Sequence, residues 1–321
     1  MTYNKSLLIR ILFAANAIAV SPTTFACSSC GCTLSSDWDS QGYTTRPGWH
    51  MDLRYDYLNQ SQLRNGAHVV DRNSLTLPND REIENETKNQ YSTLGLDYSS
   101  QTDWGINIQV PYINRTHSTI AGGDTDLSYS KTNAIGDVRV LARYQGFSSE
   151  KNMGIQFGLK LSTGSFHDLF NNGPQAGSAL DRGLQAGTGT TDVLLGLYHF
   201  GTLNKNWDYF TQGLIQHTLA EREGYQLGTS LNINTGVRYM ANEQIVPQIQ
   251  INGKTARQDK GINADTDNSG GTLFYLSPGI TVNVSKDLNI FGFIQAPIYQ
   301  NVRGYQLTPH YTASIGVRYA M

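Results

Sequence analysis

The sequence has no long hydrophobic run after its first 26 residues. A membrane-spanning helix needs about 18 or more consecutive, mostly apolar residues, and no later stretch approaches that length. The mean hydropathy of -0.38 and the hydrophobic content of 39% point the same way. The chain is therefore not a bundle of membrane-spanning helices.

The sequence also lacks an excess of charge of either sign. It has 24 Lys and Arg against 26 Asp and Glu, for a net charge of -2, which provides no basic field for nucleic acid. It contains no Gly-x-Ser-x-Gly or His-x-x-x-His element, and a barrel enzyme would need a nucleophile and a base of this kind. We expect neither a nucleic-acid partner nor an enzyme.

The N-terminus has the pattern of a secretory signal peptide. Lys5 and Arg10 flank or interrupt an apolar stretch, Leu7 to Val20, and Thr24-Phe25-Ala26 follows it. This order predicts export and cleavage after Ala26. An anchoring helix is the alternative, but the stretch is too short and carries Arg10 inside it. Residues 1–26 are therefore the predicted signal peptide, and the mature chain starts at Cys27.

Cysteine is scarce, and its three copies lie together at this mature start, as Cys27, Cys30 and Cys32. In an oxidising compartment an odd number leaves one thiol over after any disulfide. A purely structural role would be one local disulfide, or a lipid on Cys27 with a Cys30–Cys32 disulfide. A functional role would be a soft-metal site for Cu(I) or Zn(II), although three sulfurs alone leave a zinc tetrahedron incomplete. No other cofactor is expected.

What the sequence does have is alternation of apolar and polar residues. From Trp49 to Leu58 the odd positions are apolar or aromatic, and polar residues lie between them. A period of two places these sets on opposite faces of a strand. Similar segments, most of them long enough for the roughly 9 to 11 tilted residues that cross a bilayer, begin near Trp49, Lys88, Trp104, Ile135, Met153, Thr190, Trp207, Leu231, Gln244, Gly271, Leu288 and His310.

The gaps between these segments alternate in length. Tight turns such as Gln101–Asp103 follow the even segments, and longer gaps such as Asn59–Thr87, Gly164–Gly189 and Gln300–Pro309 follow the odd ones. Bacterial barrels have short periplasmic turns and longer external loops. The sequence predicts an all-β fold, a closed antiparallel transmembrane β-barrel of about 12 strands over residues 49–321. Residues 27–48 would form a Cys-containing N-terminal periplasmic or plug segment.

Charged residues fall on the polar phase of these segments. An Arg or Lys that faced lipid at the bilayer midplane would cost about 2–4 kcal/mol, so these side chains are expected to line the lumen. They form an open path or a core of ion pairs that holds a small barrel shut, and their mixed signs argue against strong ion selectivity. The candidates are Asp52, Arg54, Asp56, Asp97, Asp137, Arg139, Arg143, Lys160, Arg238 and Arg318.

Five motifs in order resemble one known group of proteins. They are Ile135-Gly136-Asp137-Val138-Arg139, Leu184 to Asp192, Leu276-Ser277-Pro278-Gly279-Ile280, Gln295 to Gln300 with Gly304-Tyr305-Gln306-Leu307, and Gly316-Val317-Arg318-Tyr319. Together these motifs resemble the outer-membrane barrels of the MetA-pathway of phenol degradation family. The resemblance implies a transporter-like barrel, sometimes linked to aromatic compounds, and supplies no catalytic residues. The Cys27 cluster lies outside the matched region.

Two functions remain open at this stage. One is an outer-membrane channel or transporter for a small molecule, with aromatic or apolar compounds among the candidates. The other is an envelope interaction protein whose barrel anchors a metal-binding or redox-active N-terminal segment. In either case the expected partners are outer-membrane lipid, lipopolysaccharide and the barrel-assembly machinery, together with a small-molecule substrate for the channel.

Overall fold

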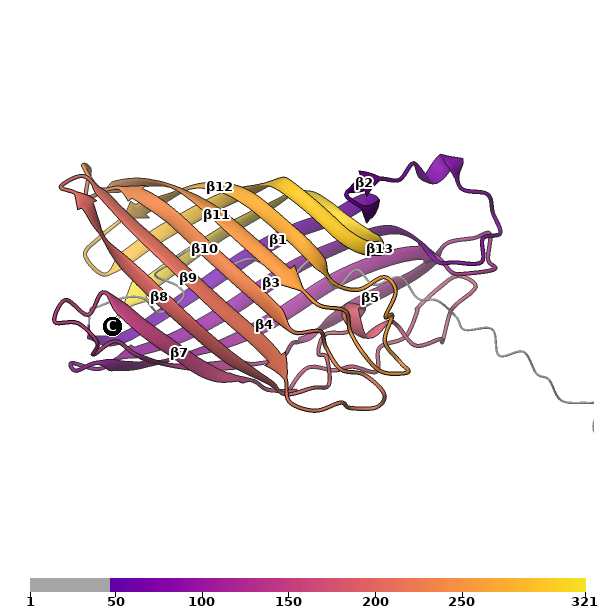
Figure 1. Ribbon diagram of the computed structural model, residues 1–321, viewed down its shortest axis with the longest axis horizontal. Coiled ribbons are helices and arrows are strands. Elements are labelled where there is room, and N and C mark those ends of the chain that lie inside the picture. Colours follow the sequence, from indigo (N-terminus) through magenta and orange to yellow (C-terminus); the bar gives the residue numbers. More distant parts are fainter. Residues whose placement is uncertain (1–46) are drawn as a thin grey trace, which may run out of the picture.

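The computed structural model describes residues 47–321, which form a closed β-barrel with strands inclined to its long axis (Figure 1). Among these residues, no helix is long and apolar enough to cross a membrane. The strands are β1 (Gly48–Gly66), β2 (His68–Val69), β3 (Ile83–Ser99), β4 (Trp104–Ile120), β5 (Ser128–Ile135), β6 (Arg139–Tyr144), β7 (Met153–Lys160), β8 (Asp192–Asn204), β9 (Trp207–Thr218), β10 (Ser230–Tyr239), β11 (Ile245–Ala256), β12 (Gly271–Asn283) and β13 (Leu288–Ala320), with short 3₁₀ helices η3 (Arg72–Ser74) and η4 (Arg182–Leu184).

The ring closes because β13 pairs with both β12 and β1. All neighbouring strands are antiparallel, so the chain must run along the barrel wall an even number of times. The long strand β13 satisfies this condition because it runs along the wall, reverses and runs back. Its residue Val302 lies opposite Gly271 of β12 and Gly66 of β1 at one end of the barrel, and the chain reverses next to Gly304, whose φ is +62°. The predicted closed antiparallel barrel is confirmed.

Strands β5 and β6 share one pass. Both pair with β4, β5 along Tyr112 to Thr119 and β6 along Trp104 to Gln109. The break between them contains Gly136, where an added Cβ would lie 2.8 Å from the Ile113 side chain and 3.1 Å from the Ala186 carbonyl oxygen. The loop that contains Ala186 therefore packs against the wall at Gly136, and the regular ladder of strand hydrogen bonds is interrupted there.

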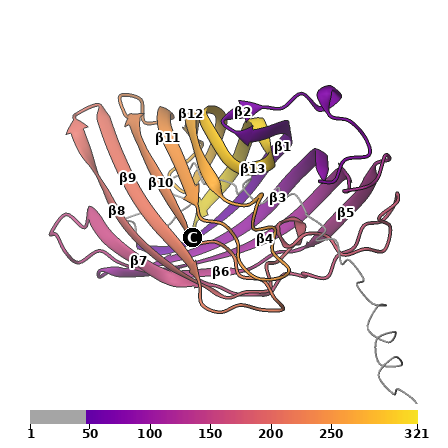
Figure 2. The ribbon, with the colours of Figure 1, turned by 45° about the vertical axis from the view of Figure 1, so that its right-hand side comes forward.

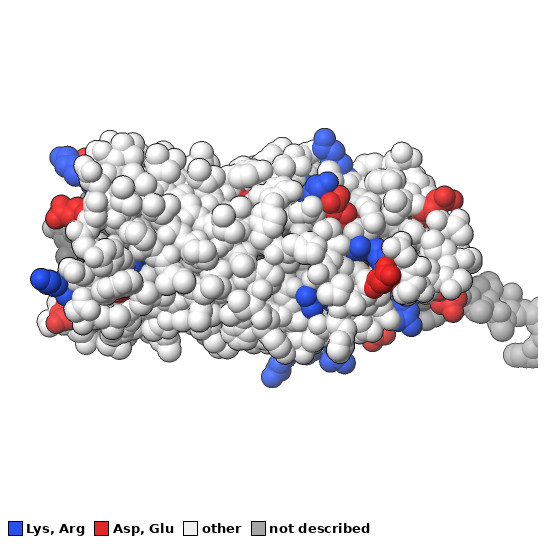
Figure 3. Space-filling view, turned by 90° about the horizontal axis from the view of Figure 1, so that it is seen from above, with Lys and Arg blue, Asp and Glu red and all other residues white. Residues whose placement is uncertain are grey.

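The alternation read from the sequence becomes an exterior and an interior. On β1, Trp49 and Leu53 are 48% and 55% exposed, whereas Asp52 between them is 6% exposed. Aromatic side chains gather at the outer rim where the short turns lie. The ring centroids of Trp49 and Tyr98 are 4.9 Å apart, and those of Tyr98 and Trp104 are 5.5 Å apart. Figure 3 shows that Lys, Arg, Asp and Glu gather toward the two ends of the viewed face and leave an almost uncharged band between them.

Several strands run further than the sequence pattern indicated. Strand β1 continues to Gly66 and β3 starts at Ile83, inside the predicted gap Asn59–Thr87. The predicted loop Gln300–Pro309 is wrong, because these residues belong to β13 and pair with their neighbours up to the turn. Polar residues extend these hairpins beyond the apolar exterior, where alternation no longer marks a strand.

Candidate functional site: the barrel interior

The ten charged residues predicted from the sequence lie at the inner face of the barrel. Arg139 and Arg238 are half-buried. The other eight, each at least nine-tenths buried, are Asp52, Arg54, Asp56, Asp97, Asp137, Arg143, Lys160 and Arg318. Most of these side chains meet in the separate groups described below.

The first group joins β3, β4 and β6. The Arg143 guanidinium donates to both carboxylate oxygens of Asp97, at 2.6 and 3.0 Å. Asn107 donates to the same carboxylate at 3.3 Å. An added Cβ at Gly105 would collide with the Arg143 guanidinium, so a glycine on the neighbouring strand makes room for this pair. A bidentate Arg–carboxylate contact is among the stronger ion pairs.

A second group lies where the barrel closes between β1 and β13. Arg54 Nε donates to Asp56 at 2.8 Å, and Ser314 Oγ donates to the other Asp56 oxygen at 2.6 Å. Asp52 and Arg318 lie opposite one another across the same ladder. This group ties the last strand of the chain to the first.

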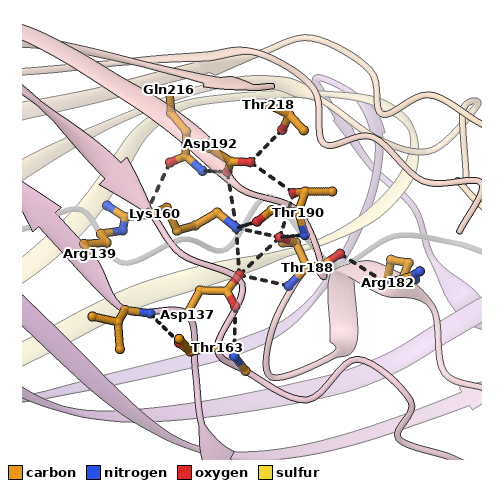
Figure 4. Close-up of polar contacts among 12 residues, drawn as sticks. Asp137, Arg139, Lys160, Thr163, Arg182, Thr188, Thr190, Asp192, Gln216 and Thr218 are labelled. Carbon is orange, nitrogen blue, oxygen red and sulfur yellow. Dashed lines mark hydrogen bonds and ion pairs between the residues drawn. The ribbon is translucent and has the colours of Figure 1, made fainter. Parts of the chain in front are cut away.

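The third group surrounds Lys160 at the end of β7 (Figure 4). The Lys160 ammonium lies 2.7 Å from Asp137 and 3.3 Å from Asp192, and it donates to Thr188 Oγ1 at 2.6 Å and to the Thr190 carbonyl at 2.9 Å. Two carboxylates, Asp137 in the break between β5 and β6 and Asp192 at the start of β8, thus share one buried cation. We call Lys160, Asp137 and Asp192 the lysine hub.

The lysine hub fastens both ends of the loop 161–191, which connects β7 to β8. Asp137 accepts from the backbone nitrogen of Gly164 at 3.1 Å and from that of Thr188 at 3.0 Å. Asp192 accepts from Thr190 Oγ1 at 3.0 Å and from Thr218 Oγ1 at 2.8 Å. The loop is therefore held to the inner wall by buried charge.

The middle of this loop packs against the inner face of β4. Arg115, on the inner face of β4, donates to the Gly183 and Gln185 carbonyls of the loop at 3.2 and 3.3 Å. Phe170, Leu180 and Leu184 form a small buried cluster, and Phe170 lies 6.2 Å from the His117 ring of β4 between ring centroids. We call loop 161–191 the inner loop, because it packs against residues of the inner wall at the end of the barrel that carries the long loops.

Two further loops cover the same end, as Figure 2 shows. Asp259, in the loop after β11, accepts from Tyr225 Oη at 2.8 Å and from the Gly228 backbone nitrogen at 2.7 Å. Burial raises the pKa of the Asp259 carboxyl above its ordinary value, and these hydrogen bonds oppose the increase. The Arg182 side chain of the inner loop lies over the Phe166 ring, 4.4 Å from its centroid, and 3.4 Å from Glu223.

Uncharged amide side chains from β7, β9, β10 and β11 line one part of the wall. They donate and accept in a continuous chain, with contacts of 2.8 to 3.3 Å and a weaker contact of 3.4 Å between Asn252 and Gln250. Each is buried. We call this set the amide belt; it consists of Gln156, Gln212, Asn234, Asn252, Gln250 and Gln248.

The interior opens into a cavity of about 1480 Å³ at the end with the short turns. Polar side chains from many strands line it, including His50, Asp208, Arg238 and Arg318. Phe200 also lines it, and packs beside the buried Tyr198 and Phe210. The two ends of the interior therefore differ, one holding the inner loop and the other an open chamber.

Sequence reasoning missed several residues of this interior. Arg115 lies on the same polar phase of β4 as the buried Asn107, and Asp192 lies on the buried phase of β8, so the same alternation was sufficient to find them. Asp192, the first residue of β8, is fully buried. Cys27, Cys30 and Cys32, the predicted metal or disulfide residues, lie outside the described residues, as does the predicted signal peptide.

Comparison with known proteins identifies the fold. No protein-family model and no curated protein sequence matches the chain. Among solved structures, the chain is similar to the COG4313 outer membrane channel from Pseudomonas putida F1, with a TM-score of 0.62, 11% identity, and coverage of 89% of this chain and 100% of that one. The translocator domain of the autotransporter NalP from Neisseria meningitidis gives a TM-score of 0.50 at 10% identity, over 88% of this chain and 92% of that one. The chain thus has the fold of an outer-membrane β-barrel, as the resemblance in its sequence implied.

Proposed function

We propose that the chain forms a channel for small molecules in the bacterial outer membrane, and that the inner loop closes it. The apolar exterior supports the membrane location, because an exposed row such as Trp49, Leu53 and Tyr55 suits lipid. The polar interior supports passage of a solute. We further propose that the short turns face the periplasm and the long loops face outward.

The inner loop is the observation that carries this proposal. It packs against the inner wall at one end, while the other end holds a cavity of about 1480 Å³. Hydrogen bonds attach it to Asp137 of the lysine hub, to Arg115 and to β5. Because the hub residues lie outside residues 161–191, displacement of the loop breaks hydrogen bonds, each worth about 0.5–1.5 kcal/mol net, and leaves the buried ion pairs in place. Displacement of the loop into water is therefore less costly than the number of its contacts suggests.

The interior also bears on the solute. Paired charges of both signs and the amide belt favour a small solute that forms hydrogen bonds, with little selection between cations and anions along the barrel. Aromatic or apolar solutes, which the sequence resemblance implied, would find the Tyr198, Phe200 and Phe210 patch near the short turns. We propose that the channel takes small polar molecules.

Planar-bilayer recordings test this function. The full-length protein should show small, infrequent openings, and a variant in which residues 166–185 are replaced by a short Gly-Ser linker should show a several-fold larger and more persistent conductance. The matched control removes residues 71–80, a loop at the same end whose Arg72 donates to the Ser61, Glu84 and Asn85 carbonyls of β1 and β3. Equal conductance of all three proteins, or none in any, would overturn the proposal.

A further inference from the structure

Arg318 is a buried cation on the inner face of β13 that differs from the cations described above. It is 4% exposed, and its Nη1 atom is buried without a hydrogen-bond partner among residues 47–321. By contrast, Arg54, Arg143 and Lys160 each have a carboxylate at 2.6 to 2.8 Å. Arg318 also lines the cavity at the short-turn end.

The carboxylate expected to pair with Arg318 is turned away from it. Asp52 lies opposite Arg318 in the β1–β13 ladder, but its carboxylate covers Gly95 of β3 on the other side, where an added Cβ would collide with it. Because Gly95 has no side chain, the Asp52 carboxylate has room beside β3 and points away from the cavity. Asp52 acts on Arg318 through space and leaves the Nη1 atom unpaired.

Three of the four carboxylates at the cavity rim are already engaged. Asp208 pairs with Arg238 at 3.5 Å and Asp287 with Lys286 at 3.8 Å, and Glu150 accepts from Asn152 at 3.0 Å. These three carboxylate residues are all more exposed than Arg318. A buried guanidinium without a full set of acceptors is costly, and a bound anion would remove that cost.

We infer that the cavity binds a small organic carboxylate, with its carboxylate group on the Arg318 guanidinium. This site rests on the proposed channel function, in which the cavity is the chamber through which a solute enters or leaves. A planar guanidinium matches the two oxygens of a carboxylate. The lining holds three Lys or Arg against four Asp or Glu, so one negative charge is accommodated at Arg318, whereas a doubly charged solute meets repulsion from the rim.

Binding measurements on the purified full-length barrel in detergent test this site. The probes are ¹³C-labelled propionate, followed by NMR titration, and propionamide, which has the same shape without the charge. Inorganic phosphate distinguishes a carboxylate site from a general oxyanion site. Propionate should bind, propionamide should not, and phosphate should bind more weakly than propionate. Arg318→Gln should weaken propionate binding by about 10- to 100-fold, the loss expected for hydrogen bonds to a charged group.

Arg238→Gln serves as the matched variant, because Arg238 lines the same cavity but is paired with Asp208. It should weaken propionate binding less than Arg318→Gln does. Equal binding of propionate and propionamide by the unaltered protein would overturn the inference without any variant, as would tighter binding of phosphate. Bilayer recordings on the same preparation separate the two proposals: conductance without propionate binding refutes this site alone, and propionate binding without conductance refutes the channel.

Discussion

The two ends of the barrel interior are filled in different ways. At the loop end, the lysine hub and Arg115 bind the inner loop, so the buried charges there have partners from distant parts of the chain. At the short-turn end no long connection among residues 47–321 folds back, and the interior is a cavity with Arg318 at its wall. Wall residues pair with most of the buried charges; the contrast shows that at one end a loop adds further partners, whereas at the other end the space stays open for a solute.

The largest expected effect on the free energy of unfolding comes from a substitution at the loop end. Lys160→Met would leave Asp137 and Asp192 buried without their shared cation, which should cost about 3–5 kcal/mol in unfolding free energy. Urea unfolding monitored by gel mobility measures the loss, and protease cleavage within residues 161–191 should become faster. Arg238→Met is the comparison at the short-turn end, where the pair with Asp208 is half-buried at 3.5 Å, and about 0–1 kcal/mol is expected. Equal losses in the two variants would contradict the difference between the ends.

A second prediction compares two exterior positions of β8. Leu195 and Leu203 are 54% and 60% exposed, and Leu203 lies beside the turn to β9. Leu195→Arg should reduce the folding free energy in lipid vesicles by about 2–4 kcal/mol, as expected near the bilayer midplane, whereas Leu203→Arg should cost about 0–1 kcal/mol near the interface. The reverse order would place the membrane at a different height on the barrel.

The smallest expected effect concerns acid at the loop end. Because the folded pKa of Asp259 is raised above 3.8, the folded loops bind this proton more tightly than the unfolded chain does. Their stability is then fully present below 3.8 and decreases as the pH rises through the raised folded pKa. Hydrogen exchange of residues 257–270 should therefore slow, after correction for intrinsic rates, when the pH is lowered from 7 to 4. Asp259→Asn should remove this pH dependence, and an unchanged dependence would assign it to another group.

Alternation along the chain was sufficient to predict the barrel, because lipid outside and polar side chains inside impose a period of two on every pass. The same phase identified Asp97, Arg143 and Lys160 as interior residues. It could not predict their partners, since Lys160 meets Asp192 only when β7 and β8 pair in the observed register. Nor could it show that residues 161–191 fold inward, because a loop held by backbone carbonyls and scattered polar contacts has no periodic signal.

A disulfide between the inner loop and the wall tests the central claim most directly. Tyr129 of β5 and Asn172 of the inner loop form an antiparallel bridge, in which each backbone nitrogen donates to the other residue's carbonyl, at 2.9 and 3.2 Å. Their Cα atoms are therefore about 5.5 Å apart, within the range of a disulfide. In a background with Cys27, Cys30 and Cys32 changed to Ser, the oxidised Tyr129→Cys/Asn172→Cys protein should remain closed in planar bilayers, and a reductant should restore openings. Openings of the same size and frequency before and after reduction would show that the inner loop does not close the path.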